Sequence, residues 1–218
     1  PRSTLFPYTT LFRSVEKPLT KTVGQAEKLV DIAKRNKLCL FVGHVFLYNE
    51  IFKKIKKIHK NESIKHANFE WKKLGTFDED IFENLLSHDL ALNLELFGVP
   101  KKIQIKNKYS LLTPVDRFSL ELFFGKTRRS EITIDRTSHY KKKTVMITTR
   151  KNYYIWDNDE LLKFDKKTET YKKIFQSKNM PLYLECKEFI RIISAKNYSV
   201  DSAILAKKIS SLILKIPK

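Results

Sequence analysis

Glycine is scarce in this sequence, with five residues among 218. They are Gly24, Gly43, Gly75, Gly98 and Gly125. This spacing cannot build the glycine-rich turn that holds a nucleotide phosphate. The two cysteines, Cys39 and Cys186, are too few for a disulfide framework, and we expect both to be buried thiols. No stretch approaches the ~20 consecutive apolar residues that a membrane-spanning helix requires, so we expect no membrane contact.

Acidic residues are in a clear minority, with 24 Asp and Glu against 43 Lys and Arg, which gives a net charge of +19. Such a charge would suit a polyanion such as nucleic acid. However, lysines occur along the whole chain and outnumber arginines, whereas recognition of bases and phosphates favours the arginine fork. We therefore favour solvated lysine surfaces and expect no nucleic-acid partner.

The first fourteen residues have neither helical nor strand periodicity. Residues 4–14 match, one for one, the translation of a widely used short-read sequencing adapter. We interpret residues 1–14 as a non-native segment and exclude them from the prediction of the fold. We expect the natural coding sequence to continue upstream of Val15.

Residues 15–48 have the pattern of the closing part of a doubly wound α/β sheet. Residues 15–17 are typical of the end of a buried strand, and a helix that begins at Thr20 or Thr22 follows. Residues 38–43 form a continuous apolar run, which is typical of a parallel strand covered on both faces. Strand, helix and strand in this order predict the closing portion of such a sheet, as a unit separate from the residues that follow.

Residues 49–218 predict a second, α+β domain. A helix is expected from near Asn49, a half-buried strand around residues 67–71, and a helix from about Asp80 to Phe97 that ends at Gly98. After residue 100 the apolar positions alternate with period two, which predicts an open, mainly antiparallel sheet of roughly five to seven strands. Two helices, near residues 182–195 and 200–216, should close the chain, with the helices of this domain packed on one face of the sheet.

Four short segments, in order along the chain, resemble the glucose-fructose oxidoreductase/inositol dehydrogenase/rhizopine catabolism (Gfo/Idh/MocA) family. The similarity extends from Val15 to the C-terminus. The segments are Glu16-Lys17-Pro18-Leu19, Val42-Gly43-His44 with Phe46-Leu47-Tyr48-Asn49, Ser87-His88-Asp89, and Pro181-Leu182-Tyr183-Leu184-Glu185 through Phe189.

The resemblance implies a Rossmann domain that binds NAD or NADP, of which residues 15–48 would be the remnant, followed by a substrate domain built on an open sheet, residues 49–218. It also implies what these 218 residues lack, because no Gly-x-Gly-x-x-Gly turn is present. We therefore expect most of the cofactor site to be missing and the chain itself to be inactive. For the parent enzyme we expect hydride transfer between the nicotinamide and a hydroxyl or carbonyl of a sugar, sugar nucleotide or cyclitol.

Two residues are the candidate catalytic pair. Lys17 follows a strand at its carboxyl end, where open α/β sheets place their ligands, and we expect it to stabilise negative charge and take part in proton transfer. His88 is the candidate acid/base, because imidazole titrates nearest neutrality. The resemblance also implies that Glu16, Lys17 and Pro18 contact the cofactor.

Asn84 departs from the family pattern, since many members have an aspartate one helical turn before the histidine. An amide can hydrogen-bond a sugar hydroxyl but cannot take its proton. Tyr48, Asn49 and Asp89 are lesser candidates for substrate contact. We expect the remaining histidines to be structural or exposed and expect no metal site. These histidines are His44, His59, His66 and His139.

Two alternatives remain open. Asn84 favours a non-catalytic homologue that uses the open sheet for subunit association, and the charge alone would favour a basic nucleic-acid-binding protein. For the oxidoreductase we expect a bacterial, cytoplasmic homodimer or homotetramer that associates through the open sheet.

Overall fold

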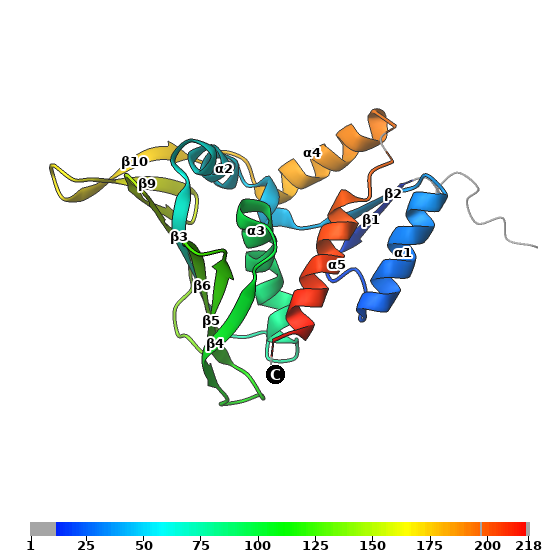
Figure 1. The fold of residues 1–218 in the computed structure, drawn as a ribbon, viewed down its shortest axis with the longest axis horizontal. Helices are drawn as coiled ribbons and strands as arrows, with labels where there is room; N and C mark the ends of the chain where they lie inside the picture. The colour runs from blue at the N-terminus through cyan, green and yellow to red at the C-terminus, as the bar shows by residue number, and fades with distance from the viewer. Residues whose placement is uncertain (1–11, 197, 217–218) are drawn as a thin grey trace, which may run out of the picture.

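The computed structural model describes residues 12–196 and 198–216 and shows two sheets with helices between and around them (Figure 1). Residues 1–11 of the segment predicted to be non-native lie outside the described residues. None of the helices in the described range is long and apolar enough to cross a membrane.

The smaller sheet pairs β1 (Phe12–Glu16) in parallel with β2 (Cys39–Gly43), and α1 (Val23–Arg35) connects the two strands. The predicted strand–helix–strand unit is therefore present. The hydroxyl of Thr22 accepts from the amide of Gln25 at 3.2 Å, so Thr22 rather than Thr20 caps the helix.

One expectation for this unit was wrong: β1 is not a buried strand. Its residues are exposed or partly exposed, because β2 is its single partner among the described strands and covers one edge only. β1 also begins at Phe12, three residues inside the segment predicted to be foreign. Strand pairing uses main-chain groups, so it depends little on which side chains those residues carry.

The two C-terminal helices, α4 (Pro181–Ser194) and α5 (Asp201–Leu214), return to this small sheet. Leu40 and Val42 point to a cluster shared with α1 and α5, whereas Cys39 and Phe41 point to the opposite side, where Ile192 of α4 packs. In Figure 1, α5 runs between α1 and α3 and joins the two halves of the molecule.

The larger sheet has eight strands in the order β10-β9-β8-β7-β3-β6-β5-β4, one more than the upper end of the expected range. It is mainly antiparallel, as predicted, but β3 lies in its centre, parallel to β6 and antiparallel to β7. The strands are β3 (Ile64–Lys72), β4 (Lys102–Tyr109), β5 (Arg117–Phe124), β6 (Arg128–Asp135), β7 (Lys142–Thr149), β8 (Tyr153–Asp157), β9 (Glu160–Asp165) and β10 (Thr170–Gln176).

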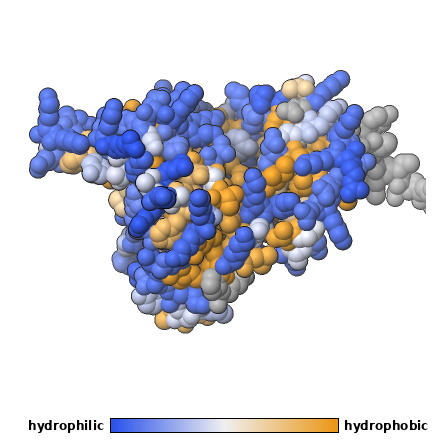
Figure 2. Space-filling view, viewed as in Figure 1, coloured by the Kyte–Doolittle hydropathy of each residue, from blue (hydrophilic) through white to orange (hydrophobic). Residues whose placement is uncertain are grey.

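The inner face of this sheet packs against α2 (Glu50–Glu62) and α3 (Ser87–Phe97), which forms the main core. Phe69, Leu120 and Ile132 of the central strands are fully buried there. Figure 2 shows hydrophobic residues gathered over the middle of the molecule, around α3 and α5, while the outlying strands and helices are hydrophilic. Burial of the core side chains between the sheet and these helices is the main favourable term for folding.

The cysteine prediction was half right. Cys39 is buried in β2, but Cys186 is exposed on α4. The reason is local: Glu185, the preceding residue, takes the buried side of α4, which leaves Cys186 toward solvent.

Candidate active site

The side chain of Lys17 reaches from the carboxyl end of β1 to the segment that leads into α3. Its Nζ donates to the carbonyl of Asn84 at 2.8 Å, to Asn84 Oδ1 at 3.2 Å and to the carbonyl of Glu83 at 3.4 Å. Burial lowers the pKa of Lys17, and the nearby carboxylates of Glu79, Glu16 and Glu83 oppose this shift. Lys17 is thus an amine whose pKa is closer to neutrality than that of a surface lysine.

A π-helical turn, η2 (Phe82–Leu86), precedes α3 and provides the acceptors for Lys17. The predicted helix from Asp80 to Phe97 is therefore present but is not a regular α-helix. The amide of Ser87 donates to the carbonyl of Phe82 five residues earlier, while the Ser87 hydroxyl donates to the carbonyl of Glu83 at 2.7 Å. Such turns are frequent at functional sites because they redirect carbonyls and side chains.

An open cavity of about 260 Å³ lies beside the Lys17 ammonium. A neighbouring narrow pocket is lined by Lys17, His44 and Ser87, with the C-terminal end of α5 as its other wall. Three carboxylates and one amide therefore surround the lysine at the mouth of the site. The residues that line the open cavity are Lys17, Pro18, Glu79, Asp80, Glu83 and Asn84.

His88 lies on α3 after the π turn that holds Lys17, but it does not line either cavity. Burial, followed by the charges of Lys143, Lys17 and His44, lowers the pKa of His88 to about 2. Its Nδ1 is buried without a hydrogen-bond partner among the described residues, so any solvent contact comes through the rest of the ring. A neutral imidazole of this kind is a hydrogen-bonding group and a poor proton carrier at neutral pH.

The loop in front of the π turn is clamped by a buried ion pair. The Arg136 guanidinium donates to the carbonyls of Thr76 and Glu79, both at 2.8 Å, and through Nε to Asp116 at 3.1 Å. Both charged side chains are almost fully buried, at 4% and 1% exposure. Since Glu79 and Asp80 line the Lys17 cavity, this ion pair fixes one wall of the site.

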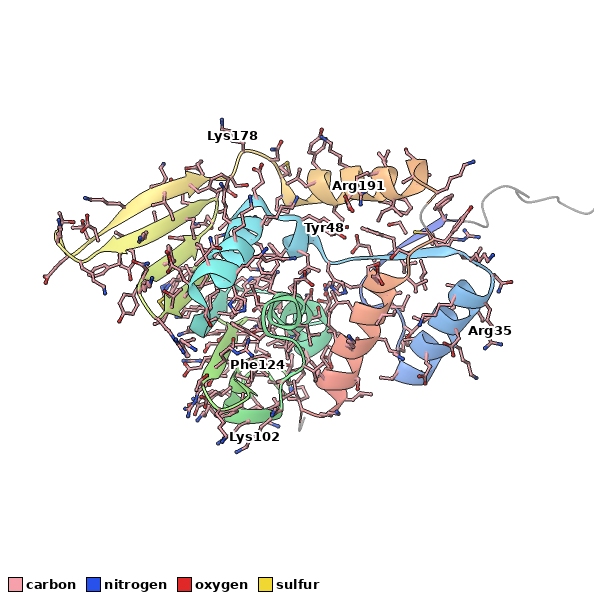
Figure 3. All side chains as sticks on the ribbon, turned by 45° about the horizontal axis from the view of Figure 1, so that its top comes forward. Arg35, Tyr48, Lys102, Phe124, Lys178 and Arg191 are labelled. Atoms are coloured by element: carbon pink, nitrogen blue, oxygen red, sulfur yellow. The ribbon has the colours of Figure 1, made fainter. Side chains whose placement is uncertain are left out.

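The other predicted site residues lie elsewhere. Tyr48 ends the short helix η1 (Val45–Tyr48), beside α4 in Figure 3, and lines a separate groove of about 880 Å³ between α2, α3 and α5. Asn49 is buried, and its Oδ1 accepts from the amide of Ile51 at 2.7 Å to cap α2. Asp89 is 1% exposed and faces the core, so these positions do not support contact with a substrate beside Lys17.

The two remaining predicted cofactor contacts flank Lys17. Glu16 is exposed at the end of β1, close enough to Glu185 to raise the pKa of that carboxyl, and Pro18 lines the Lys17 cavity.

Three functional candidates were missed by the sequence analysis. His44 is buried against Lys17, with burial first and the Lys17 charge second lowering its pKa to about 4. It follows β2 just as Lys17 follows β1, so the strand-end argument could have found it. The carboxyl of Glu185 and the amine of Lys143 are buried ionisable groups whose burial only the tertiary fold reveals.

No family model matches the chain. No curated protein matches it in sequence. Among solved structures, UDP-N-acetylglucosamine 3-dehydrogenase GnnA from Acidithiobacillus ferrooxidans has a TM-score of 0.83 at 18% identity, over 93% of this chain and 68% of the GnnA chain. The dehydrogenase MviM from Clostridium difficile has a TM-score of 0.73 at 22% identity, over 93% of this chain and 71% of the MviM chain.

The chain has the Gfo/Idh/MocA oxidoreductase fold. This confirms at the level of the fold what the four short segments predicted. The described residues supply β1 and β2 with their flanking helices and the eight-stranded sheet.

Proposed function

We propose that this chain is part of an NAD(P)-dependent oxidoreductase that transfers a hydride between a nicotinamide and a sugar, sugar nucleotide or cyclitol. The observation that carries the proposal is the half-buried Lys17 ammonium at the carboxyl edge of β1, bound to Asn84 beside an open cavity. The similarity of the fold to a sugar-nucleotide dehydrogenase supports the same substrate class.

Lys17 is the group we assign to proton transfer. Oxidation of a secondary alcohol requires its hydroxyl to lose a proton as the carbon loses a hydride. The lowered pKa of Lys17 increases the fraction of free amine that can take this proton. His88 is neutral and does not line the Lys17 cavity, so we assign the proton to Lys17 alone; His88 would accept a hydrogen bond only from a substrate that extends beyond that cavity.

The residues present fit one end of a dinucleotide. Glu16, Lys17 and Pro18 would meet the nicotinamide end, beside the cavity that Pro18 and Lys17 line. Bound nicotinamide would supply the hydride acceptor. The 218 residues contain no glycine-rich turn for the pyrophosphate, so we propose that they do not hold the cofactor alone.

The test compares this chain with a protein that also carries the upstream residues. Isothermal titration with NADH and NADPH should detect no binding to the chain and clear binding to the longer protein. A longer protein that bound neither cofactor would refute the dehydrogenase assignment.

Substitution in the longer protein tests the lysine itself. Lys17→Ala should lower turnover by about 100-fold or more, because it removes the amine that takes the hydroxyl proton and, once it has become the ammonium, stabilises the negative charge on that oxygen. Lys28→Ala, on the exposed face of α1, is the matched control and should leave turnover unchanged. Near-normal turnover of Lys17→Ala would remove Lys17 from the mechanism.

A non-catalytic homologue is the second candidate, and Asn84 favours it. Assay of the same longer protein with a panel of sugars and sugar nucleotides separates the enzyme from the non-catalytic homologue, because the homologue would turn over none of them.

For either function we propose that two copies associate through the outer face of the large sheet. That face is polar and carries the ion pairs Lys106–Glu121, Arg129–Glu121 and Lys142–Glu70.

A further inference from the structure

Lys143 occupies a position of the large sheet that faces the core. In β7 it is in register with Trp71 of β3, and it alternates with the buried residues Val145 and Ile147. Successive strand residues point to opposite faces, so Lys143 points inward with those two. A lysine at such a position is rare and calls for a specific reason.

The ammonium of Lys143 is held by two aromatic rings. Its Nζ lies 3.0 Å from the centroid of Phe46 and 3.6 Å from that of Trp71. It is buried and has no hydrogen-bond partner among the described residues. Stacking on two ring faces is the arrangement by which aromatic side chains stabilise a desolvated cation.

The same two rings also hold His88. The imidazole stands perpendicular to Phe46 with centroids 5.0 Å apart, and its centroid is 5.6 Å from that of Trp71. One aromatic cluster is therefore formed by the rings of Phe46, Trp71 and His88, and the Lys143 ammonium is packed against it. Lys143 reaches the cluster from the sheet and His88 from α3. The His88 ring cannot move without disturbing the rings that hold the lysine.

Three cationic or titratable groups face His88 from the elements packed around it: Lys143 from β7, Lys17 after β1 and His44 after β2. Asp89, the next residue on α3, is a carboxyl whose charge acts on Lys143 and opposes the effect of burial. Burial lowers the pKa of Lys143 to about 7. As the pH falls through 7, Lys143 therefore gains its charge well before His88, whose pKa is about 2, takes up a proton.

We propose that Lys143 is a positioning residue of this site: its ammonium, held by the two aromatic rings that also contact His88, fixes the His88 ring in place and adds a positive charge to the burial that disfavours its protonation. The catalytic consequence rests on the proposed function. A neutral His88 does not repel the Lys17 ammonium, and it keeps one ring nitrogen free to accept a hydrogen bond from a substrate hydroxyl.

The experiment is a pH titration of the histidine side-chain ¹⁵N signals in this chain and in Lys143→Met. Methionine keeps an apolar stem between the two rings and removes the charge. The titration runs from pH 8 to pH 2.5, and in the unsubstituted chain His88 should stay neutral down to pH 4 and take up its proton only below it. In Lys143→Met its titration midpoint should rise by about one pH unit or more, since a like charge beside it is gone.

Lys142→Met is the matched control. Lys142 pairs with Glu70 on the outer face of the sheet, so its loss should leave the His88 curve unchanged. If Lys143→Met fails to fold, Lys143→Gln removes the same charge and should give the same rise. Superimposed His88 curves in the folded variant and the parent chain would overturn the proposal.

The titration needs neither cofactor nor substrate. Unchanged His88 curves would therefore refute the role of Lys143 and leave the oxidoreductase assignment standing. Failure of the longer protein to bind NADH or NADPH would refute the oxidoreductase assignment and leave the role of Lys143 standing.

Discussion

The buried pair Asp116–Arg136 should be among the most important polar contributors to stability. The Asp116 carboxylate accepts from the amides of Leu111, Leu112 and Thr113 at 2.7, 2.6 and 2.9 Å, from the Thr113 hydroxyl at 2.6 Å and from Arg136 at 3.1 Å. Asp116→Asn keeps the shape of the side chain but removes its negative charge. It also places amide hydrogens against the groups that donate hydrogen bonds to the carboxylate.

The expected loss of stability follows from the buried charge that remains without its partner. Removing one partner of a buried pair leaves the other charge uncompensated, which costs about 3–5 kcal/mol. Here the residue left behind is Arg136, 4% exposed, which also holds the carbonyls of Thr76 and Glu79. By contrast, Glu27→Gln breaks an exposed pair with Lys207 and should cost at most about 1 kcal/mol.

The pH dependence gives an independent check. Burial alone would raise the pKa of Asp116, but hydrogen bonds from the hydroxyl and amide of Thr113 and from the amides of Leu111 and Leu112 hold it well below its ordinary value. A depressed pKa stabilises the folded state above the unfolded value, about 3.9, and this contribution is lost as the pH falls below it. The difference between parent and variant should therefore shrink below pH 4.

Urea unfolding followed by circular dichroism at pH 7 and at pH 3 measures these free energies. A destabilisation below about 1 kcal/mol at pH 7, similar to that of Glu27→Gln, would refute the reasoning, because it would mean that Arg136 is not left uncompensated.

Two further predictions concern other charged groups. Burial, and then the charge of Glu16, raises the pKa of Glu185 to about 7. Protonated Glu185 therefore contributes its full stabilisation of the folded state below the pKa of a glutamate in the unfolded chain, and this contribution is lost as the pH rises through 7. Glu185→Gln should remove this loss, which is worth about 1–3 kcal/mol between pH 5 and pH 8. Parallel plots of unfolding free energy against pH for the parent and the variant would contradict the prediction. For association through the open sheet, sedimentation should show a dimer or tetramer that Glu131→Lys weakens and Glu27→Lys, on α1, does not. A parent chain that sediments as a monomer at high concentration would rule that interface out.

Local features of the sequence were enough to predict most elements. Thr22 caps α1 and Asn49 caps α2 because a side-chain oxygen satisfies a free amide at a helix start, wherever the helix lies. Period-two alternation predicted the strands of the meander, because one face of each is buried. The position of Lys17 at a strand end predicted its place at the edge of the sheet.

Only the tertiary structure decided which charges are buried. Lys143 stands in a run of three lysines, and nothing local distinguishes it from Lys142, which faces solvent. The insertion of β3 between β6 and β7 places Trp71 opposite Lys143, and thereby sets which lysine is enclosed. The π turn before α3 and the return of α4 and α5 to the small sheet likewise depend on contacts between residues far apart in the chain, whose energies no local pattern reports.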